Sequence, residues 1–119
     1  MGKGSGKTLV FVYGTLKRGH PNHHVLAQAD SSFLMAWATS AEYEMIDLGP
    51  FPAVREGGGT AICGEIYAVG DLAPIDRLEG YPVLYDRRLI ETPCGQAWLY
   101  VMNDALGEVI PSGEWAYGR

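Results

Sequence analysis

The stretch Val10-Phe11-Val12-Tyr13-Gly14-Thr15-Leu16-Lys17-Arg18-Gly19 gives the clearest indication of the fold. Its first half is apolar and rich in β-branched and aromatic residues, which predicts a buried strand over residues 8–13. Gly14 and Gly19 bracket the following loop, and glycine permits a positive φ or the close approach of a ligand. A strand that runs into such a loop can direct the backbone N–H groups of residues 14–16 into a cavity. Rows of N–H groups bind carboxylates and developing oxyanions.

A second informative stretch is Ile75-Asp76-Arg77-Leu78-Glu79-Gly80-Tyr81-Pro82. Asp71 is a suitable N-cap for a helix over residues 72–78, and Gly80 stands where helices commonly end. An anion at a helix C-terminus among apolar neighbours has a raised pKa, so Glu79 is a candidate for proton transfer. The alternative is an ordinary surface carboxylate at a helix end.

The remaining pattern predicts many short strands and no regular alternation of strands and helices. This favours an α+β domain, a small closed or nearly closed mixed β-barrel with about two short helices. The other expected elements are a helix over residues 22–29, one or two strands over 33–46, strands over 52–54 and 60–69, a hairpin of 85–92 with 96–103, and a tail that returns Trp115 to the body.

Composition restricts the function classes. The chain has 119 residues, of which 47% are hydrophobic and 19% charged, so we expect one globular domain over residues 8–119. Residues 1–7 are polar and rich in glycine and lysine, typical of a disordered leader or tag remnant. A net charge of −5 without a basic block argues against nucleic-acid binding. No apolar run approaches the ~20 residues of a membrane span. Cys63 and Cys94 lie far apart, which is typical of reduced thiols in a cytoplasmic protein.

Two further motifs resemble a nucleotide site and a metal site, but neither is complete. Gly6-Lys7-Thr8 resembles the end of a phosphate-binding loop, but Met1 stands where that motif needs its first glycine, and the strand follows the glycines instead of preceding them. We therefore expect no nucleotide. His20, His23 and His24 cluster, but no cysteine or carboxylate nearby in sequence completes a metal site, so a solvated helix start is the favoured interpretation.

Tyr85, Arg87 and Arg88 follow the Glu79 stretch and are candidates for lining the same cleft. They are equally well explained as surface residues of a strand. The sequence leaves both alternatives open.

Several segments together resemble the γ-glutamylamine cyclotransferases of the γ-glutamylcyclotransferase-like superfamily. The segments are Phe11 to Leu26, Glu65-Ile-Tyr-Ala-Val69, Leu78-Glu-Gly-Tyr-Pro82, Tyr85-Asp-Arg-Arg88 and Ile110-Pro-Ser-Gly-Glu-Trp115. The resemblance implies a mixed α+β barrel that releases 5-oxoproline from a small γ-glutamyl substrate without a cofactor or metal. It also implies that Tyr13, Gly14, Thr15 and Leu16 hold the γ-glutamyl part and that Glu79 is the catalytic acid and base.

Three alternatives stay open. The loop of residues 14–16 can hold either the substrate's α-carboxylate or the oxyanion. The chain can also be a γ-glutamyl dipeptide cyclotransferase of the same superfamily, because its Gly57-Gly58-Gly59 region departs from the vertebrate relatives. The third alternative is a non-enzymatic module that binds a small acidic metabolite, in which Glu79 is only a polar wall.

Overall fold

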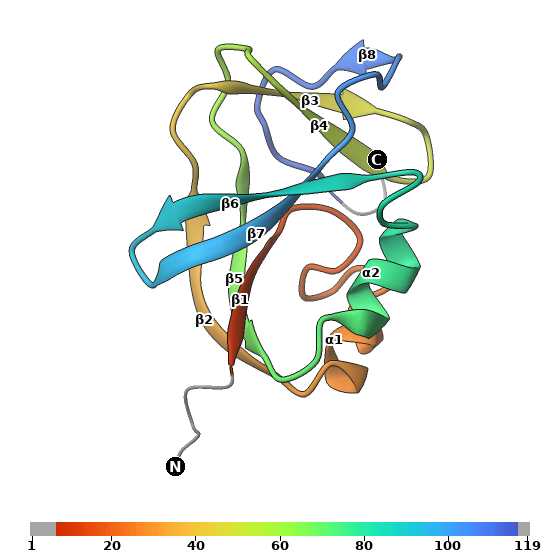
Figure 1. Ribbon diagram of the computed structural model, residues 1–119. Coiled ribbons are helices and arrows are strands. Elements are labelled where there is room, and N and C mark those ends of the chain that lie inside the picture. Colours follow the sequence, from red (N-terminus) through yellow and green to blue (C-terminus); the bar gives the residue numbers. More distant parts are fainter. Residues whose placement is uncertain (1–6, 117–119) are drawn as a thin grey trace.

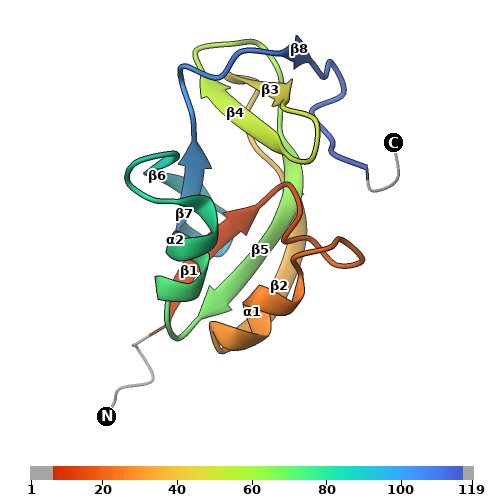
Figure 2. The ribbon, with the colours of Figure 1, turned by 90° about the vertical axis from the view of Figure 1, so that its right-hand side faces the viewer.

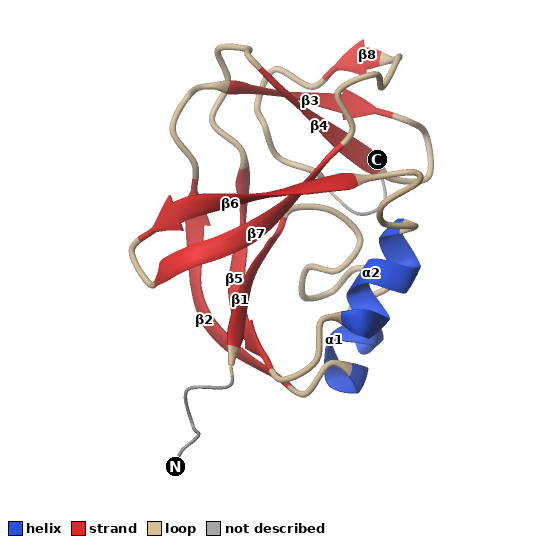
Figure 3. Cartoon of the chain, viewed as in Figure 1, coloured by secondary structure: helices blue, strands red, loops and turns tan. Residues whose placement is uncertain are grey.

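The computed structural model describes residues 7–116, so the predicted leader, apart from Lys7, lies outside the described residues. The architecture is α+β, as predicted, with strands predominating and two short helices (Figure 3). The strands are β1 (Thr8–Val12), β2 (Ser31–Ala38), β3 (Tyr43–Asp47), β4 (Pro52–Glu56), β5 (Cys63–Val69), β6 (Asp86–Thr92), β7 (Gly95–Val101) and β8 (Glu108–Val109), and the helices are α1 (His24–Gln28) and α2 (Ala73–Glu79).

The strands form two sheets. A five-stranded sheet has the order β2-β5-β1-β7-β6, and a three-stranded sheet has the order β4-β3-β8. The smaller sheet lies beyond one end of the larger one in Figure 1. Where they meet, the backbone N–H of Met102 donates to Val54 O at 2.9 Å, so the end of β7 is tied to β4. In the described residues the strands expected to form a closed or nearly closed barrel are therefore divided between two sheets that are joined where β7 meets β4.

β1 is the central strand of the larger sheet, antiparallel to β5 and parallel to β7. Its residues alternate between the two faces, as a period of two requires. Val10 and Val12 belong to the core cluster on the helix side, whereas Phe11 belongs to the cluster on the other side. All three side chains are buried. This double burial explains the continuous apolar run in the sequence, and it fixes the point at which the following loop begins.

Both helices lie on the same side of the larger sheet, with α1 beside α2 (Figure 2). The predicted end of α2 is confirmed, because Gly80 adopts a left-handed conformation with φ 66°. Asp71 accepts a hydrogen bond from the backbone N–H of Ala73 at 3.0 Å, although Leu72 occupies the N-cap position itself. The helix therefore begins one residue later than predicted and places Glu79 at its last turn.

Close packing between two strands explains a glycine in the middle of β5. A Cβ at Gly64 would collide with Val12 O and the Phe11 ring. Close packing of β5 on β1 is thus the reason for this glycine, and the sheet's bulge falls on β2 between Phe33 and Met35.

Neither described helix has the length and apolar run that crossing a membrane requires. Both cysteines, Cys63 and Cys94, are free thiols.

Candidate functional site

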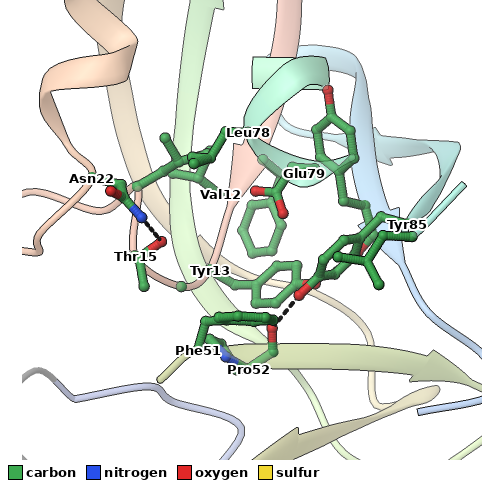
Figure 4. Close-up of a pocket in the computed structure, with 14 residues that line it drawn as sticks. Val12, Tyr13, Thr15, Asn22, Phe51, Pro52, Leu78, Glu79 and Tyr85 are labelled. Carbon is green, nitrogen blue, oxygen red and sulfur yellow. Dashed lines mark hydrogen bonds between the residues drawn. The ribbon is translucent and has the colours of Figure 1, made fainter. Parts of the chain in front are cut away.

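A cavity of about 220 Å³ opens between the loop after β1, the start of β4 and the end of α2 (Figure 4). Its walls are mostly apolar and aromatic, and Glu79 is the one charged side chain among them. The lining residues are Phe11, Val12, Tyr13, Gly14, Thr15, Leu16, Asn22, Phe51, Pro52, Leu78, Glu79, Leu84, Tyr85 and Tyr100. This is the shape and composition of a small-molecule pocket.

Glu79 projects from the last turn of α2 into the centre of this pocket, between the β1 loop and Tyr85 (Figure 4). Burial and, to a smaller extent, the nearby charge of Asp76 together raise the pKa of its carboxyl from 4.5 to about 7. No described residue donates a hydrogen bond to the carboxylate, and no lining residue is a cation. Glu79 is therefore able to gain and lose a proton near neutral pH.

The opposite wall is the loop of residues 13–16. It is closed by two backbone hydrogen bonds, from Lys17 N to Gly14 O at 3.1 Å and from Asn22 N to Thr15 O at 2.9 Å. Within the described part of the chain, no residue accepts a hydrogen bond from the backbone N–H groups of Gly14, Thr15 or Leu16. Asn22 also donates to Thr15 Oγ1 at 2.9 Å, which leaves the hydroxyl hydrogen of Thr15 available. The loop thus offers several hydrogen-bond donors to an anion.

The reason for glycine at position 14 is packing. Gly14 does not have a positive φ, so that part of the expectation is wrong. A Cβ built there would lie 2.9 Å from Cγ and Cδ of Pro52, closer than carbon atoms normally approach. The close approach is therefore to β4, and glycine lets the loop and β4 enclose the same cavity.

The loop is anchored from behind by charged groups. Glu65 on β5 accepts hydrogen bonds from the backbone N–H of Arg18 and from Tyr67 Oη, each at 3.0 Å. Lys17 is buried, and its Nζ donates to Trp115 O at 2.7 Å. Burial lowers the pKa of the Lys17 ammonium. The C-terminal segment around Trp115 therefore holds the loop in place. This contact agrees with the predicted return of Trp115 to the body of the domain.

Two tyrosines form the floor of the pocket. Tyr13 Oη donates to Tyr100 O and Tyr85 Oη donates to Pro52 O, both at 2.8 Å. Burial raises the pKa of both phenols, and the nearby Glu79 raises it further. Both groups therefore stay protonated at neutral pH with their hydrogens engaged, so they shape the pocket instead of transferring protons.

Comparison with known proteins fits this geometry. The sequence model of the family described as "Gamma-glutamyl cyclotransferase, AIG2-like" matches residues 10–117. The chain belongs to this γ-glutamyl cyclotransferase family. The match includes the β1 loop, Glu79 and every other residue that lines the cavity.

Individual relatives agree. A Vibrio cholerae protein, named only provisionally as a γ-glutamylcyclotransferase, is 44% identical over 111 residues, which cover 90% of this chain and 94% of that protein. The human protein named γ-glutamylaminecyclotransferase is 40% identical over 91 residues, covering 69% of this chain and 60% of the human protein. The crystal structure of a mouse AIG2-like protein superposes with a TM-score of 0.82 at 26% identity, covering 95% of this chain and 90% of the mouse chain.

The structure of this γ-glutamyl cyclotransferase family member gathers most of the site residues predicted from sequence. Tyr13, Gly14, Thr15, Leu16, Glu79 and Tyr85 all line the one cavity. Arg87 does not line it. Instead, Arg87 Nη1 binds both carboxylate oxygens of Asp76, at 2.8 and 2.9 Å, just behind α2.

Other lining residues went unrecognised in the sequence. Phe51 and Pro52 enter from the start of β4, and Tyr100 enters from β7, because the two sheets meet at this point. No local pattern marks such long-range neighbours. Asn22 lies within the stretch that carries the family resemblance, and this was the one available signal. Among the described residues, no group of three His, Cys, Asp or Glu side chains is arranged to hold a metal ion.

Proposed function

We propose that the protein is a γ-glutamylamine cyclotransferase that converts γ-glutamyl amines into 5-oxoproline and a free amine. The observation that carries the proposal is the Glu79 carboxyl, which has a pKa raised to about 7 and faces a loop of available N–H donors across one small cavity. A single proton-transferring group and an anion-binding loop are sufficient for an intramolecular acyl transfer.

The chemistry begins with the substrate's α-ammonium group, which loses a proton to the Glu79 carboxylate. The freed α-amine attacks the γ-carbonyl carbon of the same molecule and forms the C–N bond of a five-membered lactam. Glu79 then protonates the departing nitrogen as its C–N bond breaks. Glu79, again a carboxylate, takes the second proton from the attacking nitrogen and passes it to the departed amine, which leaves as an ammonium ion, so protons and charge balance. The nucleophile is already tethered, and correct orientation contributes roughly 7–11 kcal/mol to such reactions.

We assign recognition of the glutamyl part to the β1 loop. The N–H groups of Gly14, Thr15 and Leu16, with the Thr15 hydroxyl, bind the α-carboxylate, which is fully charged before the reaction begins. Binding there leaves the adjacent α-ammonium directed toward Glu79. Tyr13 and Tyr85 close the floor around the methylene carbons.

An amine substrate is favoured over a dipeptide by the charge of the cavity. A γ-glutamyl dipeptide carries a second carboxylate one carbon from the scissile amide nitrogen, and no lining residue is a cation that could pair with it. In γ-glutamyl-ε-lysine the second carboxylate lies at the far end of the lysine chain, beside an ammonium group. Leu78 and Leu84, both partly exposed, instead present an apolar edge that suits an alkyl chain. The human relative named γ-glutamylaminecyclotransferase points to the same class.

The decisive experiment measures 5-oxoproline released from γ-glutamyl-ε-lysine. A γ-glutamyl dipeptide and a γ-glutamyl-ε-lysine that is acetylated on the glutamyl α-amine are measured in parallel. The proposal predicts turnover of the isopeptide and none of the acetylated form, which lacks the nucleophile. A strong preference for the dipeptide would retain the chemistry and contradict the amine specificity. Binding of 5-oxoproline without any turnover would instead support a binding module.

A further inference from the structure

Helix α2 carries a second carboxylate, Asp76, one turn before Glu79. Positions three apart are neighbours on a helix surface. Asp76 Oδ1 accepts hydrogen bonds from Tyr100 Oη at 2.5 Å and from Arg87 Nη1 at 2.8 Å, and its Oδ2 is 2.9 Å from the same Arg87 nitrogen. Asp76 is therefore held from two strands, β6 and β7, whereas the Glu79 carboxylate has no such partner.

Arg87 is itself fixed by stacking. Its guanidinium lies 4.2 Å from the ring centroid of Tyr81 and 4.4 Å from that of Trp98. The side chains of Arg87 and Asp76 are exposed by only 18% and 23%. An ion pair with so little exposure is screened by solvent less than a surface pair, so its charges act on neighbouring groups.

Tyr100 connects this ion pair to the cavity. It lines the pocket, donates its hydroxyl hydrogen to Asp76 and accepts the Tyr13 hydrogen bond at its backbone carbonyl. The ionisable groups that face Glu79 from neighbouring elements are Tyr13 after β1, Tyr85 before β6 and Tyr100 on β7. Burial raises the pKa of all three phenols, so they are neutral across the physiological range. The start of β4 contributes Phe51 and Pro52, which do not ionise.

The charged groups that remain near Glu79 are the members of one ion pair. The charge of Asp76 disfavours the ionised form of Glu79. Because the Arg87 guanidinium is paired with Asp76, its opposite charge must offset part of that effect. Arg77, on the same helix, is exposed to solvent. Removing either member of the pair leaves the other charge uncompensated, and the two removals have opposite signs.

We propose that the Asp76–Arg87 pair, held by Tyr100, positions the end of α2 and sets how tightly the Glu79 carboxyl holds its proton. The role rests on the proposed function of Glu79 as acid and base. Asp76 and Arg87 do not touch substrate in this account, so they are positioning residues and act through charge.

The test is a direct titration of the Glu79 side-chain carboxyl by ¹³C NMR in the absence of substrate, with Glu79→Gln to assign the signal. Asp76→Asn should lower the titration midpoint by roughly one pH unit, and Arg87→Gln should raise it by a similar amount. The double variant should titrate near the wild-type midpoint. Single variants that leave the midpoint unmoved, or move it in the same direction, would overturn the proposal.

Two controls separate charge from structural damage. Arg87→Lys keeps the positive charge but loses the planar stack, so it should lower the melting temperature while holding the midpoint near wild type. The comparison of Arg87→Lys with Arg87→Gln separates the effect of charge from structural damage, even if Asp76→Asn does not fold. Asp86→Asn removes a carboxylate from the exposed pair with Arg88 on the same strand and should leave Glu79 unmoved.

The titration needs no turnover, so it tests this inference even if the protein releases no 5-oxoproline. Where the protein does release it, the acid limb of the kcat/KM profile should shift with the NMR midpoint in each variant. If the kcat/KM profile does not shift when the NMR midpoint does, Glu79 is not the catalytic acid and base. The inference that the Asp76–Arg87 pair sets the protonation of Glu79 would still hold.

Discussion

The two walls of the cavity contribute different chemistry. The β1 loop presents backbone N–H groups and one hydroxyl, which are fixed donors whose charge does not change with pH. The end of α2 presents Glu79, a carboxyl whose pKa is raised to about 7 and whose charge therefore does change. In the proposed function the loop therefore binds the substrate, and the end of α2 transfers its protons.

The largest effect is expected from removing the ionisable group of the α2 wall. Glu79→Gln keeps the size of the side chain but cannot exchange a proton at neutral pH. We expect kcat for 5-oxoproline release to fall by roughly 10²–10⁴-fold, the usual contribution of general acid–base catalysis, with KM little changed. If Glu79→Gln retained activity within a few-fold of wild type, the end of α2 would not be the wall that transfers protons.

The same substitution should stabilise the fold, because a raised carboxyl pKa opposes folding once the group is charged. The stability that Glu79 contributes in its protonated form is complete below pH 4.5 and is lost as the pH rises through about 7. Denaturant unfolding at pH 8 should show Glu79→Gln more stable than wild type by about 2–3 kcal/mol, and at pH 4.5 the two should be nearly equal. Equal stability of the two proteins at pH 8 would mean that Glu79 is not buried.

The loop wall should respond to space instead of charge. In Gly14→Ala the new methyl group must displace Pro52, whose ring carbons lie 2.9 Å from it, at a cost of roughly 1–3 kcal/mol in unfolding free energy. KM should rise more than kcat falls, because the loop binds substrate. The matched control is Gly59→Ala, where the added methyl group meets no atom within 4 Å and both constants should be unchanged. If Gly14→Ala lowered kcat and left KM normal, the β1 loop would take part in proton transfer, which would contradict its assignment to substrate binding.

The sequence predicted the two walls unequally well. The strand–loop junction and the Glu79–Gly80 helix end are local patterns, so periodicity and capping located both. The conformation of Gly14 was not predictable in the same way, because the reason for glycine there is Pro52 on a distant strand. Position alone made Arg87 a candidate for the cleft, but its partner Asp76 lies on α2 and draws it behind the helix. β8, only two residues long, carries too little periodicity to be recognised.

Asp76 could have been found from the sequence, since it precedes Glu79 by three residues on a predicted helix. What the sequence cannot supply is which strands neutralise it, because Arg87 and Tyr100 reach it across the β6–β7 hairpin. In our proposal this long-range pairing sets the charge beside Glu79, which adds to the larger effect of burial on its pKa.

The most direct measurement of the central claim is the pH dependence of kcat/KM for γ-glutamyl-ε-lysine from pH 5 to 9. We expect kcat/KM to rise with pH through a midpoint near 7, as the Glu79 carboxyl loses its proton, and Glu79→Gln to show no such rise in its residual activity. A profile that is flat through this range in wild type, or a Glu79→Gln variant with the same rise, would contradict the assignment of Glu79 as the group that moves the proton.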